Sequence, residues 1–149
     1  MNTSGMFSWN ISTSTRELKL DPDPASVRMA RDFVRRSLGD LGFPESAEDG
    51  GLIVSELATN VILWAPQQPF LVVIRVDGDH PVIEVHDGSS VLPERREPDF
   101  VAEHGRGLHL VDALCAQWEC VKSGSGKAVI VKLPSRRRLQ QTTGKDVRK

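Results

Sequence analysis

Apolar residues recur with a helical period in two segments of the chain, and these segments predict two amphipathic helices. The first helix is expected to begin at Asp23 and Pro24, because aspartate caps a helix and proline is tolerated at its first position. Gly39 and Gly42 are expected to end this helix. Its apolar residues are Ala30, Phe33, Val34 and Leu38.

The second helix is expected to begin near Ser46, where Asp49 three residues later forms a weak version of the capping box. Gly50 and Gly51 each cost about 1 kcal/mol relative to alanine in a helix interior. They lie in the first turns, so the helix is still predicted. Pro66 ends it, because the residue before a proline avoids the helical region. The apolar stripe of this helix consists of Val54, Leu57, Ala58, Val61 and Ile62.

Strands are predicted where apolar residues alternate or run together between turn residues. The segments FLVVIRV and PVIEVHD flank an Asp-Gly-Asp turn at 77–79 and predict a hairpin. Gln117–Lys122 and Lys127–Leu133 predict a second strand pair, preceded by a short helix from about Leu108 to Leu114. The loosely alternating segment Met6–Ile11 predicts an edge strand.

The order of these elements is strand, two helices, two strands, loop, helix and two strands. This order indicates an α+β fold, a two-layer sandwich with the helices on one face of a mostly antiparallel sheet. The loop Gly88–Gly107 has no sustained periodicity, and loops of this length in small domains are commonly functional or mobile. The polar and basic segment 135–149 is expected to be a disordered tail.

Composition narrows the class of protein. The chain has 149 residues, of which 39% are hydrophobic, and this is typical of one soluble globular domain. A net charge of −1 argues against a domain that binds nucleic acid directly. No apolar run approaches the roughly 20 residues of a membrane helix. The two cysteines, Cys115 and Cys120, form neither a CxxC motif nor a cluster with the spacing of zinc ligands. No secretory signal is visible either, so a cytoplasmic location is expected.

Candidate chemistry begins on the second helix. Glu56 and Asn60 are four residues apart and therefore share a face, which lies outside the apolar stripe. A carboxylate can accept a proton, and an amide oxygen is a hard ligand suited to Mg²⁺. A solvated helix face is the alternative interpretation of the same pair.

Two further segments carry candidate chemistry. Asp87-Gly88 lies at a strand end, where the aspartate can accept a hydrogen bond from an amino group such as that of adenine, or simply form a turn. Gly105-Arg106-Gly107-Leu108 precedes a helix, whose start attracts anions, and its glycines allow the backbone to approach a phosphate. A flexible connector is the alternative. The planar fork of Arg106 suits a phosphate, and a solvated loop arginine is equally consistent with the sequence.

The candidate segments occur in the order helix with Glu56 and Asn60, strand with Asp87-Gly88, long loop, and Gly105–Leu108 before a helix. In this order they resemble the GHKL (Bergerat-fold) ATPase superfamily, and more narrowly the RsbW-like anti-sigma-factor serine/threonine kinases. The likeness covers roughly residues 8–134, so residues 1–7 are expected to be an N-terminal extension and 8–134 the ATPase domain. It is carried by SELATN (55–60), VHDGS (85–89), GRGLHLVDAL (105–114) and GSGKAVIVKLP (124–134), and DPDPASVRMARDFVRRSL (21–38) is similar to the family's first helix.

The resemblance implies a role for each matching residue. Glu56 would be the catalytic general base, Asn60 would coordinate Mg²⁺ on the ATP phosphates, and Asp87 would bind the adenine amino group. The γ-phosphate would go to a serine of a STAS-type anti-anti-sigma antagonist, and the protein would also sequester a sigma factor. Such kinases commonly dimerise, so a homodimer is one expectation; no membrane or nucleic acid is expected as a partner.

The resemblance also assigns the glycine-containing segments to nucleotide binding. Gly88 opens the segment Gly88–His104, which would form the ATP lid. Gly105 and Gly107 would shape the end of the lid that cradles the phosphates, and the helix after them would offer its N-terminus.

Three positions depart from the family pattern. Ser89 stands at the third position of the superfamily's DxGxG motif, where backbone freedom is lost. Trp64 stands where a histidine or arginine often follows the asparagine, and an indole cannot act as acid, base or cation. Ala128 replaces a threonine that often follows Gly-Lys. These departures keep a second function open: a partner-switching regulator that binds nucleotide or protein without useful turnover.

Aromatic and histidine side chains near the candidate segments have simpler interpretations. Trp64 and Phe70 are expected to cover the core, with a wall of the pocket as the alternative, and Trp118 is expected to pack. His86 and His104 are expected to be a sheet-end and a loop histidine rather than metal ligands.

Overall fold

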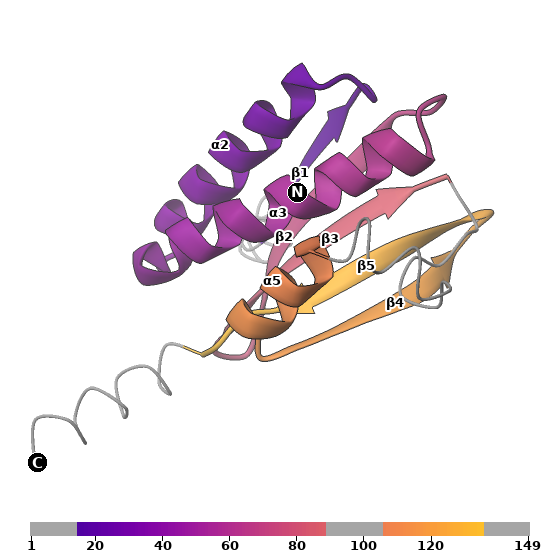
Figure 1. The fold of residues 1–149 in the computed structure, drawn as a ribbon. Coiled ribbons are helices and arrows are strands. Elements are labelled where there is room, and N and C mark those ends of the chain that lie inside the picture. The colour runs from indigo at the N-terminus through magenta and orange to yellow at the C-terminus, as the bar shows by residue number, and fades with distance from the viewer. Residues whose placement is uncertain (1–14, 89–105, 136–149) are drawn as a thin grey trace, which may run out of the picture.

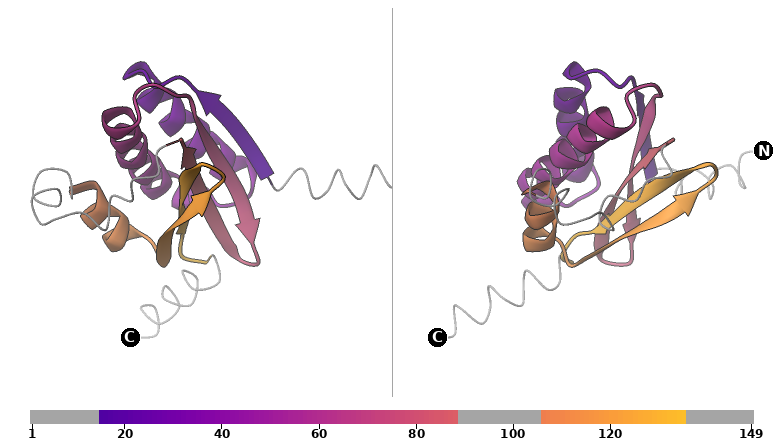
Figure 2. Two further views of the ribbon diagram at one scale, coloured as in Figure 1. Left: turned by 90° about the vertical axis from the view of Figure 1, so that its right-hand side faces the viewer. Right: turned by 45° about the vertical axis from the view of Figure 1, so that its right-hand side comes forward.

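One antiparallel sheet with helices on one face forms the body of the protein (Figures 1 and 2). The computed structural model describes residues 15–88 and 106–135. The strand order is β1-β2-β3-β5-β4, with every neighbouring pair antiparallel. The predicted α+β sandwich is therefore confirmed. The elements are β1 (Thr15–Leu20), α2 (Ala25–Asp40), the 3-10 helix η1 (Pro44–Ser46), α3 (Ala47–Trp64), β2 (Phe70–Asp77), β3 (His80–Asp87), α5 (Arg106–Leu114), β4 (Gln117–Ser123) and β5 (Gly126–Lys132).

The first strand differs from its prediction. Met6–Ile11, which the pattern predicts as an edge strand, lies outside the described residues, as do the segments 1–7 and 136–149. The observed edge strand β1 escapes the pattern because polar residues fill most of it and only Leu20 is buried. Edge strands with charged side chains are common, because charges discourage pairing with a further strand.

The two long helices differ in whether a side chain forms a hydrogen bond at the helix start. Helix α2 begins at Ala25, one residue later than predicted, and Pro24 is its N-cap residue. The side chain of Asp23 still accepts a hydrogen bond from the backbone N–H of Ala25 at 3.0 Å, as expected of a residue that caps the helix start. The capping box at Ser46 is wrong, because its side chain makes no capping hydrogen bond. Ser46 continues from η1 with helical backbone angles, φ −97° and ψ −1°, whereas a capping residue needs non-helical ones.

The helix ends are close to their predictions. Helix α2 includes Gly39 and ends at Asp40, while Gly42 after it has φ 97°, a left-handed conformation that favours glycine. Helix α3 ends at Trp64, two residues before Pro66, as expected. No helix in residues 15–88 and 106–135 is long and apolar enough to span a bilayer.

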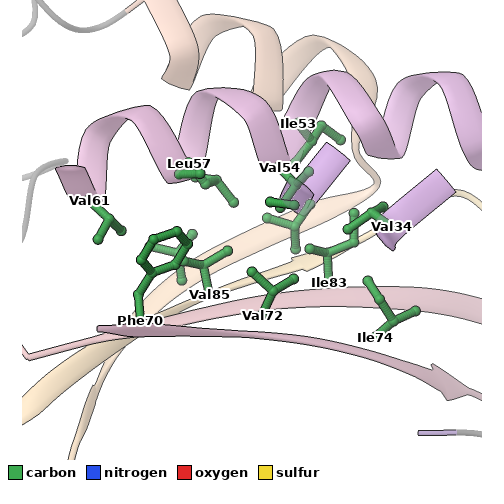
Figure 3. Packing of buried hydrophobic residues seen from close by; sticks show 14 of the residues in the cluster. Val34, Ile53, Val54, Leu57, Val61, Phe70, Val72, Ile74, Ile83 and Val85 are labelled. Carbon is green, nitrogen blue, oxygen red and sulfur yellow. The ribbon is translucent and has the colours of Figure 1, made fainter. Parts of the chain in front are cut away.

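The core lies between α3 and the sheet. Figure 3 shows Leu57 and Val61 pointing toward Phe70 and Val85 of the strands below, with Val54 further along the same stripe. Phe70 is 2% exposed, which confirms that it covers the core. Trp118 packs against the edge of this cluster, and its indole N–H donates to the carboxylate of Asp112 on α5.

The two glycines at the start of α3 have a packing role. A Cβ atom at Gly50 would lie 2.5 Å from the Cδ1 atom of Leu38 and 3.1 Å from the Cγ1 atom of Val34. A Cβ atom at Gly51 would lie 3.0 Å from the side-chain carbons of Arg35. The low helix propensity of these glycines is therefore the cost of a close approach between α2 and α3.

We expect Gly50→Ala to lower the free energy of unfolding by up to about 2 kcal/mol, because an overpacking cost of about 1–3 kcal/mol at the α2–α3 contact outweighs the gain of about 1 kcal/mol in helix propensity. The matched control is Gly39→Ala, because a Cβ atom at Gly39 would meet nothing within 4 Å. The control should be neutral or more stable in urea unfolding. Equal stabilisation by both substitutions would contradict the packing role.

Candidate functional site

Glu56 and Asn60 lie on α3, one turn apart and outside its buried stripe. Both side chains are half-buried, whereas Leu57 and Val61 beside them are buried in the core. In the part of the chain that the structure describes, neither the Glu56 carboxylate nor the Asn60 amide forms a hydrogen bond or ion pair. The helix therefore holds two polar groups that make no hydrogen bond or ion pair with residues 15–88 and 106–135.

Helix α3 is fixed sideways by a polar clamp from α2. The Nε atom of Arg31 donates to the Ser55 hydroxyl at 2.8 Å, and this hydroxyl donates to the carbonyl oxygen of Gly51 at 2.8 Å. Ser55 is buried, so its hydrogen bonds satisfy a polar group that would otherwise be costly to bury. The clamp lies directly before Glu56 in the sequence and limits rotation of the helix that carries it.

Asp87 is the last residue of β3 and points to the helix-covered face of the sheet. Val85 and Ile83 precede it at alternate positions and are buried in the core, and alternation places Asp87 on the same face. Its side chain is only 2% exposed. The predicted position at a strand end is therefore correct, and the side chain is buried rather than part of an exposed turn.

The ammonium of Lys127 contacts both carboxylate oxygens of Asp87. Its Nζ atom lies 2.9 Å from Oδ2 and 3.1 Å from Oδ1. Lys127 pairs with Asp87 across the β3–β5 ladder, and both side chains are buried. No local pattern in the sequence predicts Lys127 as a site residue. The two residues are 40 positions apart, and only the strand register brings them together.

The α3 residues lie over the end of the sheet that carries Asp87. Leu57 and Val61, which flank Asn60 on the helix, point toward Phe70 and Val85 (Figure 3). Val85 lies two residues before Asp87 on the same face of β3. The turn of α3 that bears Asn60 therefore faces the strand end that bears the buried carboxylate.

Only some of the remaining predicted site residues lie in the described part of the chain. Arg106, Gly107 and Leu108 form the first turn of α5, a helix that also contacts α3. Gly88 directly follows β3. Gly105 and residues 89–104, which include Ser89 and most of the expected lid, lie outside the described residues.

The structure shows the surroundings of Trp64 and Ala128, two positions that depart from the family pattern. Trp64 is 45% exposed, so the expectation that it covers the core is wrong. It is the last residue of α3, four positions after Asn60, and so shares the side of the helix that Asn60 occupies. Ala128 pairs with His86 and lies on the opposite face of the sheet from Lys127, because neighbouring residues of a strand alternate in direction.

The opposite face of the sheet carries its own charged network. Glu84 forms an ion pair with Arg75 on β2, and its Oε1 atom lies 2.8 Å from the Nε2 atom of His86. The Nδ1 atom of His86 lies 3.3 Å from the Ser123 hydroxyl. His86 is thus a sheet-end residue, as expected; His104 is outside the described residues. Among the residues that the structure describes, no group of three His, Cys, Asp or Glu side chains could hold a metal ion.

The charged network shifts the acidity of Glu84. Burial alone would raise the pKa of this carboxyl, but hydrogen bonds and positive charge from Arg75 and His86 outweigh burial and hold the pKa below its ordinary value of 4.5. A carboxyl whose pKa is lowered in the folded protein stabilises the fold above the ordinary pKa. This contribution is lost as the pH falls through the lower, folded-state pKa.

Comparison with known proteins identifies the family. The histidine kinase-like ATPase domain family matches residues 20–133, and the chain therefore belongs to this family. Among solved structures, the chain is similar in fold to the RsbU and RsbW domains of Rv1364c from Mycobacterium tuberculosis, with a TM-score of 0.59 and 18% sequence identity. The match covers 82% of this chain and 34% of that one, so this chain spans about a third of the length of that structure. No curated protein matches the chain.

We expect Glu84→Gln to flatten the dependence of stability on pH. Between about pH 6 and about pH 3, the free energy of unfolding of the wild type should fall more steeply than that of the variant, because only the wild type must protonate this paired carboxylate. The exposed Glu119, on neighbouring β4, provides the matched control Glu119→Gln, which should keep the wild-type slope. Identical slopes for all three proteins in urea titrations would refute the role of the network.

Proposed function

We propose that the protein binds ATP with Mg²⁺ beside α3 and transfers the γ-phosphate to a serine of a protein antagonist. The observation that carries the proposal is the pair Glu56 and Asn60, two half-buried polar side chains on the helix that covers the Asp87 end of the sheet. Neither has a hydrogen-bond or ion-pair partner among the described residues. Membership in the histidine kinase-like ATPase family supports a nucleotide as the ligand.

Adenine recognition is assigned to Asp87. A buried carboxylate is an acceptor with no donor of its own, and it suits an exocyclic amino group of a base. The phosphates are assigned to the N-terminal turn of α5, Arg106–Leu108, where backbone N–H groups lack intrahelical partners and attract anions. Gly88 and Gly105 flank the segment proposed as the lid.

Asn60 is the proposed ligand of Mg²⁺. Its amide oxygen is a hard ligand, and it has no hydrogen-bond partner among the described residues that would compete with a cation. A single protein ligand is sufficient for Mg²⁺, because this ion retains several waters and binds phosphate oxygens. When bound, Mg²⁺ neutralises negative charge on the phosphates.

Glu56 is the proposed general base. As the seryl oxygen of the antagonist forms a bond to the γ-phosphorus, the Glu56 carboxylate accepts the seryl proton. The bond from the γ-phosphorus to the β–γ bridging oxygen breaks, and ADP leaves. Catalysis of this kind depends on positioning and charge neutralisation more than on covalent participation of the protein.

The proposed partners are a STAS-type antagonist as phosphate acceptor and a sigma factor that the protein sequesters. The RsbW-like motifs and the fold likeness to an RsbW-containing structure support this pairing. In this proposal, phosphorylation of the antagonist controls which of the two proteins is bound, and the protein acts in the cytoplasm.

Replacing Glu56 with glutamine should separate binding from transfer. We expect Glu56→Gln to lower the rate of labelled phosphate transfer from γ-labelled ATP to a purified STAS-type antagonist by about a hundredfold or more, with little change in ATP affinity. The control Glu48→Gln removes an exposed carboxylate in the first turn of the same helix. ATP binding without transfer by the wild type would instead favour a regulator without turnover.

Replacing Asn60 with alanine should remove the dependence of ATP binding on Mg²⁺. We expect the wild type to bind ATP more tightly in Mg²⁺ than in EDTA, and the variant to bind it equally weakly in both, as measured by calorimetry. The neighbouring exposed Thr59 gives the control Thr59→Ala, which should retain the wild-type ratio. An unchanged ratio in Asn60→Ala would exclude its role as a ligand.

A further inference from the structure

The ion pair of Lys127 with Asp87 is an unusual feature of the nucleotide site proposed above. Lysine side chains are almost never fully buried unless they are paired, and the side chain of Lys127 is only 6% exposed. The pair lies on the helix-covered face, at the end of the sheet where adenine is proposed to bind. Any ligand that reaches Asp87 therefore also meets the ammonium of Lys127.

The backbone holds Lys127 in this position. A Cβ atom at Gly126, the preceding residue, would lie 1.9 Å from the carbonyl oxygen of Asp87 and 2.8 Å from the Cα atom of Gly88. Only glycine allows this close approach of β5 to the end of β3. If β5 slid along β3, the close contact at Gly126 and the pairing of Lys127 with Asp87 would both be lost. Lys127 can therefore leave Asp87 only by rotating its side chain.

The hydrogen-bonding capacity of the ammonium is only partly used. An ammonium has three donors, and the described contacts of Nζ are the two with the oxygens of Asp87. No further described residue accepts from it. The pair therefore presents a donor and an acceptor side by side, the pattern that complements the Watson–Crick edge of adenine, with its 6-amino donor and its N1 acceptor.

Resting on the proposed function, we infer that Lys127 is a second base-reading residue, which donates a hydrogen bond to N1 of adenine while Asp87 accepts one from the 6-amino group. Guanine would have to place its two N–H donors against both Asp87 oxygens. The ammonium already contacts those two oxygens, so two guanine donors would compete with it at both, whereas the 6-amino group of adenine needs to reach only one of them. Lys127 thus favours adenine over guanine.

The test compares ATP with 1-deaza-ATP, in which a C–H group replaces N1, by calorimetry. The wild type should bind 1-deaza-ATP about tenfold or more weakly than ATP, because a hydrogen bond to a charged donor is lost. Lys127→Met should bind the two nucleotides equally and more weakly than the wild type binds ATP. Lys132→Met is the matched control: Lys132 lies on the same strand, paired with Asp77, and should keep the wild-type ratio.

Three outcomes would overturn the inference and leave ATP binding intact: equal wild-type affinity for ATP and 1-deaza-ATP, tighter ATP binding by Lys127→Met, or wild-type affinity for GTP equal to that for ATP. The ratio of the wild-type affinities for ATP and 1-deaza-ATP is measured without a variant, so it tests the inference even if Lys127→Met fails to fold. Failure of the wild type to bind any of these nucleotides would instead overturn the proposed function, and the inference with it.

Discussion

Helix α3 is held against the sheet by its buried apolar stripe, and the candidate site follows from that contact. Burial of Val54, Leu57 and Val61 fixes the rotation of the helix about its axis. With the stripe facing the strands, Glu56 and Asn60 must lie to one side, half-buried and facing away from the hydrophobic interior. The glycines in the first turns of α3 let α2 approach closely, so the helix is supported both from below and from the side.

The buried Asp87–Lys127 pair is a second constraint, of an electrostatic kind. Removing two charges from water is costly, and the attraction between them offsets this cost only when the geometry is good. Here the cross-strand register and the close contact at Gly126 supply that geometry. A charged pair buried in this way contributes little net stability compared with an apolar pair of similar size. Net stability therefore does not by itself account for this pair.

The two faces of the sheet separate two kinds of polar chemistry. On the face away from the helices, Arg75 and His86 contact Glu84 and lower the pKa of its carboxyl. On the helix-covered face, Asp87 and Lys127 form a buried charged pair at the end of the sheet. Because strand residues alternate, a change from one position to the next moves a side chain from one kind of chemistry to the other, as Lys127 and Ala128 illustrate.

The sequence by itself determined the features that depend on local periodicity. The helical period located α2 and α3, and the same period placed Glu56 and Asn60 on one face; the turn residues located the β2–β3 hairpin. The missed strand β1 has too few buried positions to produce a pattern. Only the tertiary structure decided that Lys127 meets Asp87, that Gly50 lies at the close contact between two packed helices, and that Trp64 is exposed. The first two of these facts depend on contacts between residues that are distant in sequence. The third depends on which neighbours cover a side chain, and local sequence patterns report neither contacts nor coverage.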